Sequence, residues 1–305
     1  MSEINLSVNV GRLRLKNPIL LASGTVGYGD EISEFINLSE VGAIVTKSIS
    51  LKPRAGNPPE RVAETPSGML NAIGLANIGL ERFLKEKIPA LEKLGATVIC
   101  NVAASSFEEY AVCVKELDGV ETIKAFEINV SCPNVKDGGL FFGNDVNAVR
   151  KITALLRPLT TKTLIVKLSP NTTTIADFAR AVKEEGGDAV SAVNTLVGTA
   201  FDVYTRKPKI KNVTGGLSGP AIKPIALAKV LEIARNVEIP IIGLGGITTW
   251  RDAAEFMIAG ASAVQVGTAN FINPRASVEI LEGLRNFCAE QKIDNVSELT
   301  KSFAL

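Results

Sequence analysis

Eight short runs of continuous apolar residues recur along the chain, and they constrain its fold more than any other feature. Such runs, apolar at every position, are typical of parallel strands that are covered on both faces. Helical periodicity appears between them, as at 175–185, 224–235 and 251–258. Strand and helix alternating eight times predict an α/β fold of the (β/α)8 barrel type. The runs are 19–22, 43–46, 97–102, 125–130, 163–168, 189–193, 240–244 and 263–266.

The length of 305 residues fits one such barrel, for which ~250 residues are typical, although it would also allow two average domains. No linker or shift in composition divides the chain, so we expect one domain over 1–305. Residues 6–15, around Gly11, predict a small N-terminal β-hairpin that caps the barrel floor. A doubly wound sheet is the alternative, but its G-x-G-x-x-G fingerprint is present only as fragments at 27–29 and 243–246.

Composition excludes several classes of function. The chain contains no histidine, so an imidazole base, a histidine metal ligand and a Ser-His-Asp triad are impossible. Its four cysteines are scattered without a C-x-x-C pair, which argues against a zinc or iron–sulfur site on this chain. The net charge of +1 provides no field for nucleic acid or an anionic membrane. No signal peptide or membrane-spanning run is evident, and a cytoplasmic protein is expected.

Polar residues follow the apolar runs at the positions where a barrel carries its active site. Few of them are carboxylates, so no metal site is predicted. Gly245, Gly246, Gly267 and Thr268 follow the last two runs, which is the usual phosphate site of a barrel. Glycines also serve tight turns, so this pattern alone leaves both interpretations open.

Lys47 and Lys167 end two of the apolar runs. Two lysines at one barrel mouth would attract an anionic ligand or a reduced flavin. They could instead extend to solvent, or one could form a Schiff base. Cys132 follows another run and precedes Pro133, and Lys136 nearby could lower the pKa of its thiol. With histidine absent, Cys132 is a candidate proton acceptor, whereas an inert thiol is equally compatible with the spacing.

Four ordered motifs resemble the dihydroorotate dehydrogenases of pyrimidine synthesis. Residues 129–136 (Asn-Val-Ser-Cys-Pro-Asn-Val-Lys) resemble the active-site loop of that family, and 66–75 resemble its substrate loop. Residues 214–220 and 241–247 resemble its flavin phosphate region. Cysteine at position 132 resembles the soluble class 1 enzymes, and the continuation after it is most similar to the NAD-linked class 1B catalytic subunit.

The resemblance implies FMN at the barrel mouth, with Cys132 taking a proton from substrate C5 while a hydride leaves C6. It implies that Lys47 pairs with the substrate carboxylate and that Lys167 stabilises charge on the reduced flavin. The implied FMN contacts are Ser23, Lys47, Ser48, Asn101, Asn129, Lys167, Val193, Gly219, Gly245, Gly246, Gly267 and Thr268. The implied substrate contacts are Lys47, Asn71, Ala72, Ile73, Gly74, Leu75, Asn129, Asn134, Asn194 and Thr195.

The class 1B resemblance also implies a partner, because the electrons left on FMN must reach NAD+. It implies an electron-transfer subunit carrying FAD and a [2Fe–2S] cluster, in a heterotetramer of two chains of each kind. Other functions remain open: the fumarate-linked class of the same enzyme, a dihydropyrimidine dehydrogenase-type flavin reductase, a Schiff-base aldolase or a non-enzymatic flavin-binding protein.

Overall fold

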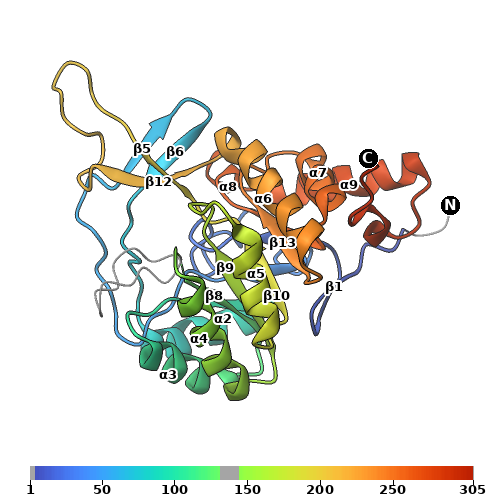
Figure 1. The fold of residues 1–305 in the computed structure, drawn as a ribbon, viewed down its shortest axis with the longest axis horizontal. Coiled ribbons are helices and arrows are strands. Elements are labelled where there is room, and N and C mark those ends of the chain that lie inside the picture. The colour runs from blue at the N-terminus through green and yellow to red at the C-terminus, as the bar shows by residue number, and fades with distance from the viewer. Residues whose placement is uncertain (1–3, 131–143, 305) are drawn as a thin grey trace.

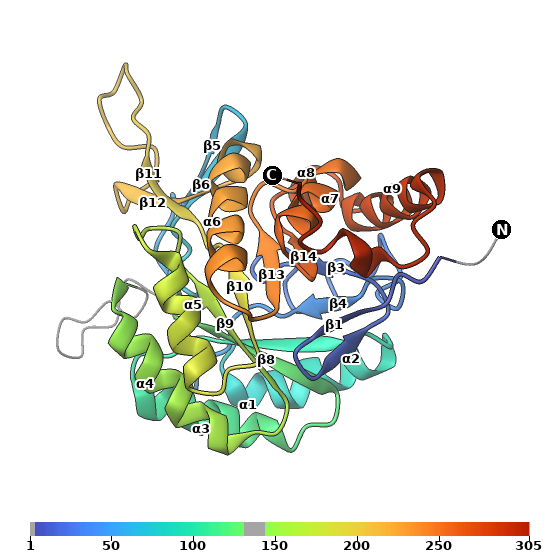
Figure 2. The ribbon, with the colours of Figure 1, turned by 45° about the vertical axis from the view of Figure 1, so that its right-hand side comes forward.

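Eight parallel strands close into a barrel in the computed structural model, which describes residues 4–130 and 144–304. Helices surround the strands (Figures 1 and 2). The predicted barrel is confirmed, and the doubly wound alternative is wrong because β14 pairs with β3 and closes the sheet. The barrel strands are β3 (Ile19–Leu21), β4 (Ala43–Val45), β7 (Val98–Val102), β8 (Ile123–Asn129), β9 (Thr163–Leu168), β10 (Ala189–Ala192), β13 (Ile241–Leu244) and β14 (Ala263–Val266).

Continuous burial explains why the apolar runs predicted these strands so closely. All five residues of β7 and all six of β9 are buried, since one face of each points into the barrel and the other meets the helices. The helices are α1 (Leu80–Arg82), α2 (Ile88–Lys93), α3 (Phe107–Asp118), α4 (Val146–Leu156), α5 (Ile175–Glu184), α6 (Lys223–Asn236), α7 (Trp250–Ala259), α8 (Ala269–Ile272) and α9 (Ala276–Gln291). Shorter helical turns occupy Phe83–Lys87, Arg157–Leu159, Pro220–Ile222 and Val296–Leu299. No helix in the described ranges is both long and apolar enough to cross a membrane.

The N-terminal hairpin is present, formed by β1 (Val8–Val10) and β2 (Leu13–Leu15). Arg12, in its turn, forms an ion pair with Asp188, the residue immediately before β10. Because Asp188 stands at the amino end of a barrel strand, the hairpin lies against the barrel floor, as predicted.

A second sheet was not predicted from the sequence. It has four antiparallel strands in the order β11 (Leu196–Thr199), β12 (Thr214–Ser218), β6 (Gly68–Asn71) and β5 (Val62–Thr65). These strands project away from the side of the molecule where the N-terminus lies (Figure 1). Residues 68–71 and 214–218 are far apart in sequence but pair directly, Asn71 with Gly216. The sheet therefore brings two of the four motifs side by side.

Candidate active site

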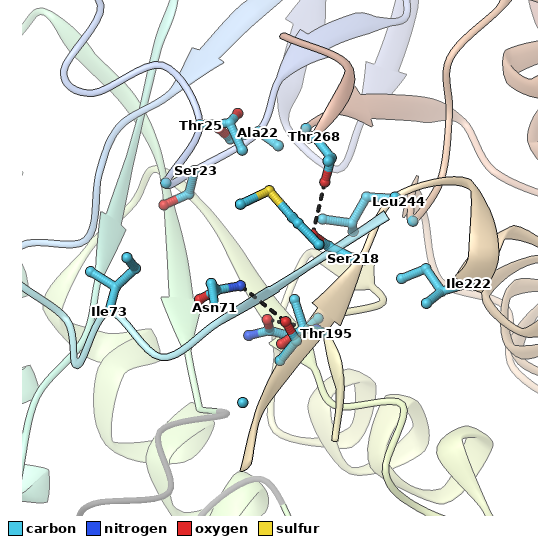
Figure 3. A pocket seen from close by; sticks show the side chains of 18 of the residues that line it. Ala22, Ser23, Thr25, Asn71, Ile73, Thr195, Ser218, Ile222, Leu244 and Thr268 are labelled. Atoms are coloured by element: carbon cyan, nitrogen blue, oxygen red, sulfur yellow. Dashed lines mark hydrogen bonds between the residues drawn. The ribbon is translucent and has the colours of Figure 1, made fainter. Parts of the chain in front are cut away.

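A cavity of about 690 Å³ lies at the carboxyl end of the barrel strands, beside the second sheet. Its size is that of a small-molecule or cofactor site. Ile73 lies on one side of it, and Ile222 and Leu244 lie on the other (Figure 3). The predicted residues that line it are Ser23, Lys47, Ser48, Asn71, Ala72, Ile73, Gly74, Leu75, Asn129, Lys167, Val193, Asn194, Thr195, Gly219, Gly245, Gly246, Gly267 and Thr268.

Three predicted residues are not among those lining the cavity. Cys132 and Asn134 lie in 131–143, outside the described residues. Asn101 is fully buried on β7, where its Oδ1 accepts a hydrogen bond from Ser48 Oγ at 2.6 Å and its Nδ2 donates to Glu127 Oε1 at 2.7 Å. Asn101 therefore supports a cavity-lining serine from behind, and its predicted contact with FMN stays a prediction.

Lys47 follows β4 and lines the cavity. Burial, and secondly the nearby Arg61 guanidinium, lower the pKa of the Lys47 ammonium. Within residues 4–130 and 144–304, no carboxylate forms an ion pair with it. The Glu31 carboxylate acts on it through space and opposes this shift, but the pKa of Lys47 remains lowered. An anionic ligand bound in the cavity would therefore meet a lysine without an ion-pair partner among the described residues.

Lys167, on β9, lines the cavity in a different electrostatic setting. Its side chain is 8% exposed, and its Nζ lies 3.6 Å from Oε1 of Glu127 on β8. The register explains this contact: Asn129 pairs with Lys167, and Glu127 stands two residues before Asn129 on the same strand face. Lys167 thus brings to the cavity a charge that is already paired within the protein.

Glu127 and Gln265 are site residues that the sequence analysis missed. Glu127 is fully buried and accepts a hydrogen bond from Gln265 Nε2 at 2.6 Å, across the inside of the barrel. Gln265, on β14, lines the cavity. The signal was a polar residue in the middle of an apolar run, Glu127 in 125–130 and Gln265 in 263–266, which is unusual for runs buried on both faces.

Amide side chains gather where the barrel meets the second sheet. Asn194 Nδ2 lies 3.4 Å from Asn129 Oδ1, and the Asn194 side chain also accepts from the backbone N–H of Thr195. From the second sheet, Asn71 Nδ2 donates to the carbonyl oxygen of Gly216 at 3.2 Å (Figure 3). Each amide offers both a donor and an acceptor, so this group can match a ring with alternating carbonyl and N–H groups.

The glycines after β13 occupy backbone conformations that other residues rarely adopt. Gly245 and Gly246 have φ of 129° and 78°, and both line the cavity. Opposite them, the Thr268 hydroxyl donates to Ser218 Oγ at 2.9 Å (Figure 3). Glycine is required here for the turn, which confirms that interpretation, whereas phosphate binding at the same turn stays a prediction.

Asp252 fixes the loop that follows these glycines. Its carboxylate accepts hydrogen bonds from the backbone N–H groups of Thr248 and Thr249 and from Lys223 Nζ, at 2.7–2.9 Å. Burial alone would raise the pKa of Asp252, but Lys223 and these N–H groups outweigh it and lower the pKa to about 2. This carboxylate holds the start of α7 to the start of α6, on either side of the glycine turn.

The three cysteines that the structure describes are poor candidates for chemistry. Burial raises the pKa of Cys100 and of Cys113 to about 12, and it also raises the pKa of Cys288. A thiol with so high a pKa is seldom a thiolate at neutral pH, so none of the three would act as a base there.

Comparison with known proteins decides the family. The sequence model of the dihydroorotate dehydrogenases matches residues 5–288. The chain belongs to the dihydroorotate dehydrogenase family. Three relatives carry the name dihydroorotate dehydrogenase B (NAD(+)), catalytic subunit. They are from Trichlorobacter lovleyi (51% identical, covering 96% of this chain and 97% of the relative), Geotalea uraniireducens (50%, covering 98% of each) and Citrifermentans bemidjiense (47%, covering 100% of each).

Dihydroorotate dehydrogenases depend on FMN, and the cavity fits that group. Gln265 Oε1 is buried and has no hydrogen-bond partner in the described structure, which leaves an acceptor for a bound molecule. A Cβ added to Gly24 would meet nothing within 4 Å, so open space stands where this cavity-lining residue could otherwise carry a side chain. The residues that line this cavity are therefore suited to hold FMN.

Asp252→Asn should lower the free energy of unfolding by about 2 kcal/mol at pH 7, because the folded protein holds the ionised carboxylate. The contribution is present above about pH 4 and declines as pH falls toward 2. Urea unfolding of both proteins should therefore show about half the difference at pH 3. Asp177→Asn, which removes an exposed ion pair with Arg180, serves as control and should change stability little at either pH. An Asp252→Asn effect independent of pH would contradict the assignment.

Proposed function

We propose that this chain is the catalytic subunit of an NAD+-linked dihydroorotate dehydrogenase, which oxidises (S)-dihydroorotate to orotate in de novo pyrimidine biosynthesis. The observation that best supports this substrate is that Lys47 lines the cavity and has no ion-pair partner in the described structure. Dihydroorotate carries a carboxylate that can pair with it, whereas a neutral dihydropyrimidine does not. This difference favours dihydroorotate over the substrate of a dihydropyrimidine dehydrogenase-type enzyme.

The amide cluster orients the pyrimidine ring in this proposal. Asn71, Asn129 and Asn194 offer donors and acceptors to the ring carbonyl and N–H groups, and Thr195 and Asn134 complete the set. Residues 71–75 line the cavity, which supports their assignment as the substrate loop.

FMN, when bound, supplies the acceptor for the hydride from substrate C6. The glycine turn at Gly245 and Gly246, together with Gly219, Gly267 and Thr268, holds its phosphate in our assignment. Ser23, Ser48, Asn129, Val193 and Lys167 hold the rest of it, with Lys167 stabilising negative charge, and Asn101 supports Ser48 from behind. One domain over 1–305 contains all of these residues.

Cys132 removes the proton from substrate C5. The raised pKa values of Cys100, Cys113 and Cys288 support this choice among the four cysteines, and the motif at 129–136 places Cys132 directly after β8 in sequence. Asn129, at the end of β8, lines the cavity, and Cys132 follows it by three residues in the sequence.

A partner subunit receives the electrons. The relatives are named as catalytic subunits linked to NAD(+), which supports a separate electron-transfer chain and favours NAD+ over fumarate as acceptor. We propose that this partner carries FAD and a [2Fe–2S] cluster, in a heterotetramer of two chains of each kind.

Anaerobic addition of dihydroorotate to the purified protein tests this function. The protein should be yellow with FMN, lose its visible flavin band on addition of dihydroorotate, and keep that band with dihydrouracil. Without its partner the reduced protein should not reduce NAD+. A protein that binds FMN but is bleached only by dihydrouracil would contradict the substrate, and rapid reduction of NAD+ by this chain alone would contradict the partner.

Cys132→Ser should bind FMN and orotate but reduce the flavin ~10²–10⁴-fold more slowly near pH 7, because a hydroxyl is a far weaker base than a thiolate. Stopped-flow absorbance after mixing with dihydroorotate measures the rate. Cys100→Ala removes a buried thiol away from the cavity and should keep the wild-type rate. Wild-type flavin reduction by Cys132→Ser would show that another group takes the proton.

A further inference from the structure

A carboxylate is fully buried inside the barrel, directly behind the cavity lining. Glu127 on β8 accepts hydrogen bonds from Asn101 on β7 and Gln265 on β14, at 2.7 and 2.6 Å, and lies 3.6 Å from Lys167 on β9. Asn101 in turn accepts from Ser48, beyond the end of β4. The Glu127 side chain thus joins residues of four strands, β7, β8, β9 and β14, and reaches Ser48 through Asn101.

Glu127 does not line the cavity, but three residues of this group do: Lys167, Gln265 and Ser48. Burying a carboxylate is unfavourable unless it is paired and hydrogen-bonded, and apolar residues usually fill such a position with no loss of stability. The position of Glu127 therefore indicates that it acts on the residues that line the cavity, and not only on the stability of the barrel interior.

The Glu127 carboxylate fixes which way the Gln265 amide faces. An ionised carboxylate can only accept hydrogen bonds, so the NH₂ group of Gln265 must point toward it. The opposite atom, Oε1, is then directed away from Glu127. Gln265 is 1% exposed, and its Oε1 has no partner among the described residues. A ligand with an N–H or O–H donor would satisfy it, and a flavin offers both, in its ring and its ribityl chain.

We propose that Glu127 is a positioning residue for the flavin site, through two neighbours. It neutralises the Lys167 ammonium at the cavity floor, and it orients Gln265 so that Oε1 accepts a hydrogen bond from the bound flavin. This inference rests on the proposed function. Glu127 thereby limits how strongly the site favours reduced over oxidised flavin, since the reduced form carries the extra negative charge.

Glu127→Gln tests the charge. The amide keeps the shape of the side chain but leaves the Lys167 ammonium without a carboxylate, so negative charge on the flavin is favoured. Spectroelectrochemistry of the FMN-loaded protein at pH 6 should show that the ratio of affinities for reduced over oxidised FMN is about tenfold higher in Glu127→Gln than in wild type. For a two-electron couple this equals a midpoint potential ~30 mV higher. A change of less than twofold would overturn the proposal.

Asp188→Asn is the matched control. Asp188 is a largely buried carboxylate that pairs with Arg12 and Arg157 at the opposite end of the barrel. Both variants should lower the melting temperature, but only Glu127→Gln should shift the potential. Equal shifts in the two proteins would mean that Glu127 acts through stability alone, which would also overturn the proposal.

Gln265→Met tests the proposed hydrogen bond between Gln265 and the flavin. This variant remains informative if Glu127→Gln does not fold. Methionine has similar length and flexibility but offers no amide, so titration of the apoprotein with FMN should show affinity reduced five- to tenfold. Unchanged affinity would remove Gln265 from the proposal.

If the wild-type protein takes up no FMN, the proposed function fails. If the wild-type protein binds FMN and the variants behave as wild type, only this inference fails.

Discussion

One buried and one half-buried lysine side chain, Lys167 and Lys47, stand at the carboxyl end of the barrel, and the described structure provides an ion-pair partner only for Lys167. Glu127 lies beside Lys167, whereas Lys47 has no ion pair with any residue of 4–130 or 144–304. A buried charge without a partner is unfavourable, and burial accordingly lowers the pKa of Lys47. This difference supports the proposal that Lys47 pairs with the carboxylate of the substrate and that Lys167 faces the flavin.

The second sheet turns the end of the barrel into a cavity. A barrel of eight strands is itself filled by side chains and offers only a shallow mouth. Pairing of β6 with β12 raises a wall beside that mouth and places Asn71 near the residues after β10. The motifs at 66–75 and 214–220 are thus held together by one pair of strands.

The barrel could be read from the sequence because its strands are buried on both faces. The run at 163–168 matches β9 at both ends, and the run at 263–266 matches β14. The second sheet could not be read in this way. Residues 62–65 alternate between exposed and half-buried positions, and 214–218 contain two glycines with little side chain to bury. Neither segment shows the apolar pattern that marks a strand.

The lining of the cavity was predictable where it follows a strand end, as with Lys47, Asn129 and Thr268. Residues of the second sheet such as Asn71 were predicted only from the resemblance to the family, because the periodicity of the sequence does not mark them. Glu127 and Gln265 were missed because their contact crosses the barrel, and only the register of strands far apart in the sequence brings them together. For the same reason the sequence could not show that Asn101 stands behind Ser48 rather than on the cavity surface.

The central claim is that Lys47 is kept unpaired for the carboxylate of the substrate. Calorimetric titration of oxidised, FMN-loaded protein with orotate tests it most directly, comparing wild type with Lys47→Met, which keeps the apolar stem and removes the charge. The account predicts that Lys47→Met binds FMN but loses ~10-fold or more in orotate affinity, the cost of leaving a carboxylate without its charged partner. Equal orotate affinity in the two proteins would contradict it.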